Sequence, residues 1–392
     1  MTDSPLIYIV AGEASGDALG ARLIRALREE TGGKVRIAGI GGSEMQAEGL
    51  SSLFPMQELS VMGIVEILPH LRRILGRMRD AADDVAAKRP DAVVTIDSPG
   101  FARGFVKRIE NRDIPRIHYV APTVWAWRPK RVYKFKAAFN HLLALLPFEP
   151  PYFEAVSLPC TFVGHSVLEC GADKGHGVVF RRHHAIAPDT KLISVLAGSR
   201  SGEVKWHLDV FGDAVRLLRQ RYNDLSIVLP TLPHLKELVE DRARSWGVPF
   251  VVTTDVTDKY DAMAASDAAI AVSGTVSLEL ALARVPTVIA YRFNPVSHWI
   301  VRKLVKIDHA SIVNILRVRN GEPPIIPERL QDQCKADILA ADLDRLLSGD
   351  GNDQLAAAAD TLNSLRPGDE MPSICAARTI LQIIGQSGPQ SS

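Results

Sequence analysis

Short apolar runs that alternate with longer helical patterns constrain the fold of this 392-residue chain most. In the first half the runs are LIYIVAG, VRIAGIG, DAVVTID, RIHYV and HLLALLP. After a polar stretch at 171–190 the series starts again with LISVLAGS, SIVLPT, FVVTTD, AAIAVSG and PTVIAYR. Runs of this kind are typical of parallel strands buried on both faces. The sequence therefore predicts an α/β fold with two doubly wound domains that face each other across a cleft.

The length of the chain supports two hydrophobic cores rather than one. We place the first domain at 1–170 and the second at 171–331, and we expect only helices at 332–386. These helices could pack back across the domains or onto a partner subunit, which leaves a homodimer open. The segment 387–392 is expected to be a disordered tail.

Composition argues against several classes of protein. The net charge is only +1, so attraction to an anionic partner requires local clusters of cations. The four cysteines show no metal-finger spacing, and neither HExxH nor an aspartate pair at metal spacing is present. We therefore expect no metal, no cofactor and reduced thiols in the cytoplasm. The sequence contains no run of about 18 apolar residues, so we expect no membrane span.

Two turns in the first half carry polar residues at the end of a predicted strand. In AGEASGD, small residues leave the backbone approachable, and Ser15 or Asp17 could cap the following helix, so Glu13, Ser15, Gly16 and Asp17 could face a polar ligand. A simple capped turn explains that pattern equally well. Asp97, in IDSPGF, follows an apolar strand and could act as a general base or belong to a helix N-cap.

Two turns in the second half have the features of a diphosphate site. Gly198, Ser199 and Arg200 join a strand to a helix, and the guanidinium fork of arginine matches phosphate oxygens. The second turn contains Ser273, Gly274 and Thr275, with Glu279 one helical turn further on. This carboxylate could accept hydrogen bonds from sugar hydroxyls or could simply be exposed on its helix.

The stretch YVAPTVWAWRPKRVYKFK combines tryptophans with a cluster of cations. Stacking on nucleic acid is one use of such a pattern, but the nearly neutral chain gives it little other support. We expect a cleft-facing loop in which Trp125 and Trp127 are packing or interfacial anchors. Arg128, Lys130 and Arg131 would then face phosphates of a substrate or of lipid headgroups.

Residues 61–80 form an amphipathic segment with a broad apolar side and an arginine-rich edge. Pro69 is expected to split the helix or to open a second one. The segment could face the protein core or lie on a membrane surface. The apolar residues that would contact the membrane are Val61, Met62, Ile64, Ile67, Leu68, Leu71 and Leu75.

Taken together, the motifs AGEASGD, VAPTVWAWRPKRV, LPFEP, FVGHSVLE, AGSRSGEV, SGTVSLELAL and ASIVNIL resemble the lipid-A-disaccharide synthase family, in that family's order. The resemblance covers nearly the whole chain. IDSPGF departs from the family's frequent IDAPDF form, and Ala197 stands where proline is usual. Asp97 and Arg200 are unaffected by both departures.

The resemblance implies a GT-B fold of two Rossmann-like domains and an inverting transfer of 2,3-diacylglucosamine from UDP. The acceptor would be 2,3-diacylglucosamine 1-phosphate (lipid X), and the product a β-1,6-linked disaccharide 1-phosphate. Asp97 would be the base or another essential acceptor-side group, and Asn314 would lie near the donor. Because both substrates carry acyl chains, the family reading favours a peripheral protein on the cytoplasmic face of the inner membrane in a Gram-negative cell. The alternatives are a UDP-N-acetylglucosamine 2-epimerase and a non-catalytic lipid- or nucleotide-binding protein.

Overall fold

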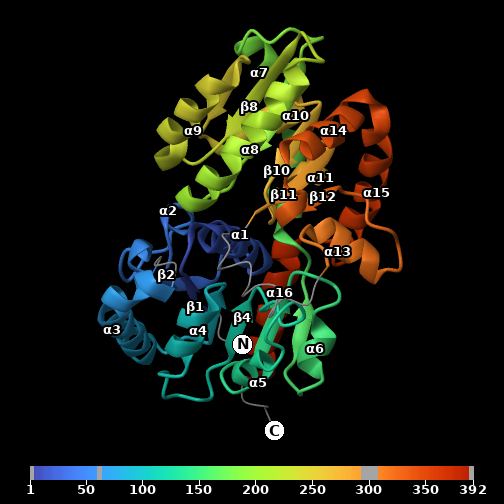
Figure 1. The fold of residues 1–392 in the computed structure, drawn as a ribbon. Coiled ribbons are helices and arrows are strands. Elements are labelled where there is room, and N and C mark those ends of the chain that lie inside the picture. Colours follow the sequence, from blue (N-terminus) through green and yellow to red (C-terminus); the bar gives the residue numbers. More distant parts are fainter. Residues whose placement is uncertain (1–3, 60–63, 293–307, 388–392) are drawn as a thin grey trace. The chain divides into compact units, whose positions relative to one another are not determined.

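The computed structural model describes residues 4–59, 64–292 and 308–387. The chain divides into two compact units, of which one combines Met1–Ser166 with Leu365–Ser392 and the other spans Val167–Ser364. The C-terminal segment expected at 332–386 is therefore shared between them. Figure 1 shows the element labels used below. Val61, Met62 and residues 388–392 lie outside the described residues, as do the side chains of Ile64, Ile67, Leu68 and Leu71.

The first unit is built on a six-stranded parallel sheet with the order β2-β1-β3-β4-β5-β6. Its strands are β1 (Leu6–Ala11), β2 (Arg36–Ile40), β3 (Ala92–Ile96), β4 (Arg116–Tyr119), β5 (His141–Ala144) and β6 (Cys160–Phe162). Every residue of β1 is buried, because side chains that alternate along the strand enter the cores on both sides of the sheet. Ile7 and Ile9 lie in one core, and Tyr8 and Val10 lie in the other.

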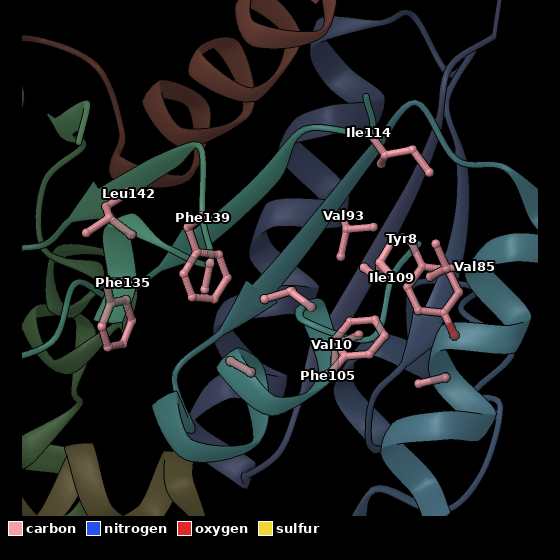
Figure 2. Close-up of a cluster of buried hydrophobic side chains, with 14 of the residues drawn as sticks. Tyr8, Val10, Val85, Val93, Phe105, Ile109, Ile114, Phe135, Phe139 and Leu142 are labelled. Atoms are coloured by element: carbon pink, nitrogen blue, oxygen red, sulfur yellow. The ribbon is translucent and has the colours of Figure 1, made fainter. Parts of the chain in front are cut away.

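Helices cover both faces of this sheet. They are α1 (Ala14–Glu30), α2 (Ser43–Ala47), α3 (Ile64–Lys88), α4 (Pro99–Val106), α5 (Arg131–Lys136), α6 (Pro150–Glu154) and α16 (Pro372–Ser387). Residues of α3, α4 and α5 share one core, part of which is shown in Figure 2, where Phe105 and Phe135 are labelled. Helices α1 and α16 contribute to the opposite core. Arg378 of α16 forms an ion pair with Glu30 of α1 at 2.7 Å, so the last helix packs on the sheet of its own chain.

Helix α3 runs without a break from Ile64 to Lys88 and includes Pro69. The prediction that Pro69 splits this segment or opens a second helix is therefore wrong. A proline inside a helix removes one backbone hydrogen bond, and the long amphipathic helix tolerates this loss. Towards its C-terminal end, Met78 is buried in the core.

The second unit contains another six-stranded parallel sheet, with the order β12-β11-β10-β7-β8-β9. Its strands are β7 (Lys191–Leu196), β8 (Leu225–Pro230), β9 (Phe250–Thr253), β10 (Ala268–Ala271), β11 (Thr287–Tyr291) and β12 (Glu328–Leu330). Its α-helices are α7 (Gly177–His183), α8 (Ser201–Arg219), α9 (Lys236–Ala243), α10 (Val256–Ala265), α11 (Val276–Leu282), α13 (Ile312–Arg319), α14 (Ala336–Arg345) and α15 (Gly351–Asn363). The predicted α/β class with two doubly wound sheets is confirmed.

The order of the strands fixes where ligands can bind. In the first sheet the order of the strands reverses between β1 and β3, because β2 lies on one side of β1 and β3 on the other. In the second sheet the equivalent reversal lies between β7 and β10. Loops at the carboxyl ends of such neighbouring strands diverge and leave a crevice for ligands. The residues after β1, β3, β7 and β10 are therefore the first places to look for a site.

Candidate functional site

The loops that follow β1 and β3 touch each other closely in the first unit. A Cβ atom added to Gly12 would lie 2.7 Å from Ser98 Oγ, so only glycine fits there without a shift. The Ser98 hydroxyl donates a hydrogen bond to Glu13 Oε1 at 3.5 Å. Asp97 and Ser98 both have positive φ angles, of 49° and 43°. Two consecutive non-glycine residues in this region are strained, and such strain clusters at functional sites.

Asp97 is half-buried on this strained turn. Burial raises the pKa of its carboxyl group, and the hydrogen bond from the Ser98 backbone N–H opposes this effect. Helix α4 begins at Pro99, with Ser98 in the N-cap position and without a side-chain cap. The role of an N-cap therefore does not account for Asp97. A carboxylate with a raised pKa at the end of a central strand is a reasonable general base.

Asp17 has a structural role that the sequence did not reveal. Helix α1 begins at Ala14 with Glu13 in the N-cap position, so the prediction that Ser15 or Asp17 caps it is wrong. The Asp17 carboxylate is 2% exposed and accepts hydrogen bonds from the backbone N–H groups of Gly42, Glu44 and Met45 at 2.7, 2.9 and 3.1 Å. It thus holds the start of α2 rather than facing a ligand.

The other residues of this turn differ in exposure. Ser15 is exposed, and Glu13 is half-buried beside Ser98. Gly16 is buried, and a Cβ atom there would lie 3.5 Å from both Ala11 Cβ and Ile96 O. A small residue at this position lets α1 pack closely on the central strands. Of the four residues predicted here, Glu13 is the one whose side chain lies at the β1–β3 crevice.

The second unit has a cavity of about 370 Å³ at its own strand reversal. Its lining includes Gly198, Ser199 and Arg200 after β7, Ser273, Gly274 and Thr275 after β10, and Glu279 of α11. The structure therefore brings together two predicted turns that are more than 70 residues apart in the sequence. Gly198 and Gly274 have φ angles of 117° and 148°, which only glycine adopts readily.

Three further polar residues in or beside this cavity escaped the sequence analysis: Glu203 and Lys259 line it, and Tyr291 contacts Glu203. Glu203 accepts a hydrogen bond from Arg200 at 3.1 Å and another from the Tyr291 hydroxyl at 3.0 Å. Burial and the Glu203 charge raise the pKa of Tyr291 to about 12, so its hydroxyl stays protonated and can donate. Glu203 and Tyr291 therefore hold the guanidinium of Arg200, which is 62% exposed.

The third of these residues is Lys259 of α10. It forms an ion pair with Glu279 at 2.6 Å, and both side chains line the cavity. The alternative that Glu279 is simply exposed on its helix is therefore wrong, because its side chain is only 18% exposed. The i,i+3 spacing from Arg200 could have indicated Glu203, but Lys259 has no comparable local signal.

Asn314, predicted near the donor, is fully buried and does not line this cavity; it lies in the wall of a separate cavity of about 580 Å³, with His309 and Glu328. Its Nδ2 group donates to Ile326 O and Glu328 Oε1, and its Oδ1 accepts from the backbone N–H groups of Ile325 and Ile326. The chain itself thus uses both donor hydrogens and both acceptor positions of the amide. Direct contact with a ligand does not fit this geometry.

Asn314 instead supports the Ser273 turn through a neighbouring carboxylate. Glu328, which accepts from Asn314, also accepts from the backbone N–H groups of Ala310 and Ser311. The carbonyl of Ala310 in turn accepts from Ser273 Oγ at 2.8 Å. A buried network thus connects Asn314 with the lining of the cavity.

The tryptophans of the cationic stretch have separate tasks in the first unit. Trp125 Nε1 donates to Glu149 Oε1 at 3.0 Å, and its ring meets Phe148 edge-on at 5.1 Å. It therefore anchors the loop to LPFEP, as predicted for an anchor. Trp127 lies under the guanidinium groups of Arg128 and Arg131, at 4.5 and 5.4 Å from its ring. Lys130 is exposed.

Neither a membrane-spanning helix nor a candidate metal centre is found among the described residues. None of their helices has the length and apolar character needed to cross a bilayer. They also contain no group of three or more His, Cys, Asp or Glu side chains placed to hold a metal ion. Leu75 is the one predicted membrane-contact residue whose side chain is described, and it is 36% exposed.

Solved structures of low sequence identity share the fold of this chain. A UDP-N-acetylglucosamine 2-epimerase from Neisseria meningitidis, bound to UDP-N-acetylglucosamine, is 11% identical with a TM-score of 0.58, over 98% of this chain and 99% of that one. A glycosyltransferase from Rickettsia africae is 13% identical with a TM-score of 0.59 over the whole of both chains. The fold is the GT-B fold.

Sequence relatives narrow the class to one family. A family model described as lipid-A-disaccharide synthetase matches residues 7–380. The lipid-A-disaccharide synthase of Rhodospirillum centenum is 50% identical over 97% of this chain and 94% of its own length. That of Paramagnetospirillum magneticum is 46% identical over 98% of this chain and 99% of its own. The chain belongs to the lipid-A-disaccharide synthase family, and it is a glycosyltransferase.

Proposed function

We propose that this enzyme condenses UDP-2,3-diacylglucosamine with 2,3-diacylglucosamine 1-phosphate. The products are the β-1,6-linked lipid A disaccharide 1-phosphate and UDP. The observation that carries the proposal is the pair of strand-end sites in a chain of this family. One holds a strained carboxylate with a raised pKa, and the other is a glycine-rich cavity with an exposed arginine.

The cavity of the second unit is suited to the UDP part of the donor. The backbone N–H groups of the turns at 198–200 and 273–275 and the Arg200 fork offer donors to diphosphate oxygens. Glu279, with Lys259 beside it, is placed to accept hydrogen bonds from ribose hydroxyls. Arg200 also stabilises the negative charge that develops on UDP as the glycosidic bond breaks. The epimerase from N. meningitidis, which binds UDP-N-acetylglucosamine, shares this fold.

Asp97 is the proposed general base in the first unit. It takes the proton from the 6-hydroxyl of the acceptor while that oxygen attacks the anomeric carbon of the donor and UDP leaves from the opposite face. Glu13 fixes the Ser98 hydroxyl and so positions the strained turn. Because the carboxyl must be ionised to act, we expect kcat/KM to fall on the acid side, at a higher pH than an unperturbed aspartate would give.

The acyl chains of both substrates suggest work at a membrane surface. We place the protein at the cytoplasmic face of the inner membrane, with segment 61–80 as its contact, while a homodimer remains a secondary proposal. Exposed Leu75 and the neighbouring arginines support this placement. Replacement of Leu71 and Leu75 by serine should weaken flotation with vesicles that contain phosphatidylglycerol. Unchanged flotation of a folded variant contradicts the membrane proposal.

The test of the function is turnover with defined substrates. We expect the purified enzyme to release UDP only when UDP-2,3-diacylglucosamine and the acylated sugar 1-phosphate are both present. Conversion of UDP-N-acetylglucosamine to its 2-epimer would favour the epimerase alternative. Binding of UDP without turnover of either substrate would favour a non-catalytic protein.

A further inference from the structure

Two arginines of the first unit lie over the ring of Trp127, and a third, Arg103, is near enough for its charge to act on one of them. Arg128 and Arg131 lie over its ring, with Cζ atoms 4.5 and 5.4 Å from the ring centre. Arg103 projects from α4, which shares a hydrophobic core with α5, the helix that begins at Arg131. Burial lowers the pKa of the Arg131 guanidinium most, and the charges of Arg103 and Arg128 lower it further.

Among the described residues, no carboxylate forms an ion pair with Arg103, Arg128 or Arg131, although many other arginines of the chain are paired. Arg103 and Arg131 are half-buried, so water screens their mutual repulsion less than it would on an open surface. A cluster of like charges in this setting is costly unless an anion occupies it.

The position of the cluster connects it to the proposed acceptor. Arg103 lies on α4, the helix that starts directly after Asp97 and Ser98. The ring of Trp127 is covered by Arg128 and Arg131, and Trp125 is held by Glu149 and Phe148, so neither ring is an open platform for a nucleic-acid base. The anion is therefore better matched by a compact group with several oxygens.

We propose that Arg103, Arg128 and Arg131 form a binding site for a phosphate monoester. A monoester carries nearly two negative charges at neutral pH and presents three oxygens, which match several guanidinium forks at once. On the proposed function, this group is the 1-phosphate of the acceptor, so the proposal rests on that function for the identity of the ligand. The cluster would then hold the sugar ring while Asp97 acts on its 6-hydroxyl.

The site can be tested without turnover. Glucosamine 1-phosphate, which has no acyl chains, is titrated into the full-length protein by calorimetry in the absence of donor. We expect Arg103→Ala and Arg131→Ala each to raise its Kd about tenfold or more, because each removes a charge-assisted contact. Arg131→Lys should recover only part of the affinity, since lysine lacks the planar fork. Lys136→Ala, which removes an exposed cation of the same helix, is the matched control and should leave the Kd unchanged.

A second set of measurements separates the two sources of a phosphate group. Glucosamine should bind to wild type at least tenfold more weakly than glucosamine 1-phosphate does. Its Kd should be the same for wild type and for the Arg131→Ala variant, because it has no phosphate to contact the arginine. If the alanine variants keep wild-type affinity for the monoester but lose binding to phosphatidylglycerol vesicles, the cluster binds headgroups and the proposal is wrong. Equal loss in Lys136→Ala would also overturn it, since a diffuse positive surface would then be sufficient. Thermal unfolding of each variant confirms that it is folded.

Binding of the monoester is independent of whether the enzyme transfers a sugar. Loss of binding in the arginine variants, together with no disaccharide from wild type, would support the site and reject the proposed function. Normal turnover with unchanged monoester affinity in all arginine variants would do the reverse. The two proposals therefore fail separately.

Discussion

Replacement of Gly12 by alanine tests whether the contact between the loops after β1 and β3 holds the Asp97 turn in place. The new Cβ would lie 2.7 Å from Ser98 Oγ and 3.1 Å from Ser98 Cβ. Ordinary van der Waals contact begins at 3.4 Å, so Ser98 Oγ must move by about 0.7 Å. A rotation of the hydroxyl could relieve the first contact, but it would break the hydrogen bond to Glu13.

The expected effect on catalysis is large compared with the effect on stability. A misplacement of about 1 Å at a reacting group can lower the rate about 100-fold, so a shift of this size should lower kcat roughly tenfold or more. Overpacking costs about 1–3 kcal/mol of unfolding free energy, which corresponds to a fall of several degrees in Tm. The variant should therefore be folded at 25 °C and yet slow.

The assay measures UDP release at saturating concentrations of both substrates. Gly100→Ala is the matched control, because a Cβ atom at Gly100 meets nothing within 4 Å although the residue lies only two positions beyond Ser98. It should keep kcat within about twofold of wild type. Equal kcat for Gly12→Ala and Gly100→Ala would refute the argument that the β1–β3 contact positions Asp97.

Three other predictions each concern the replacement of one side chain. Glu203→Gln should raise the KM for the donor up to about fivefold with little change in Tm, because its ion pair with the exposed Arg200 is worth about 1 kcal/mol or less. Asp213→Asn is the control, since Asp213 forms a similar i,i+3 pair on α8, and it should leave the KM unchanged. An equal rise of the KM in both variants would contradict the role of Glu203. Asp17→Asn should lower the free energy of unfolding by about 2–4 kcal/mol in urea titrations, since an amide cannot accept all three backbone hydrogen bonds. A loss below about 0.5 kcal/mol would be inconsistent with Asp17 holding the start of α2. Burial lowers the pKa of His118 from 6.5 to about 3, so the unfolded chain binds a proton more readily than the folded chain. The free energy of unfolding should therefore fall by up to about 1.4 kcal/mol per pH unit as the pH drops from about 6.5 towards 3. For His118→Asn the free energy of unfolding should depend less steeply on pH, and an unchanged dependence would assign the effect to other groups.

Most of the fold could be predicted from the sequence because the strands are buried on both faces. Strand β1 consists of apolar residues throughout, and β8 is interrupted only by Ser226, so their runs stand out from the amphipathic helices. The short strands β6 and β12 were missed, since three residues of mixed character give no periodic signal. Helix α7 lies in the polar stretch at 171–190 and is held by a contact that the sequence does not show: Gly177 packs against the backbone of Ala264.

The site was predictable where function depends on the backbone at a strand end. The turns at 198–200 and 273–275 were found from their small residues, and the structure places both at one cavity. Roles that depend on distant partners were not found. Asp17 binds backbone groups 25–28 residues away, and the Asn314 amide is fully hydrogen-bonded to residues around Ile326 and Glu328. Polar residues of one type thus serve ligands or the chain itself, and only the fold distinguishes them.

The most direct test of the account is the linkage that the enzyme makes. Wild type, supplied with UDP-2,3-diacylglucosamine and 2,3-diacylglucosamine 1-phosphate, should give a disaccharide whose anomeric proton coupling in NMR identifies a β-1,6 bond. Asp97→Asn should bind UDP normally and form this product at least about 100-fold more slowly. An α linkage, or wild-type turnover by the Asp97→Asn variant, would contradict the proposed inverting reaction with Asp97 as its base.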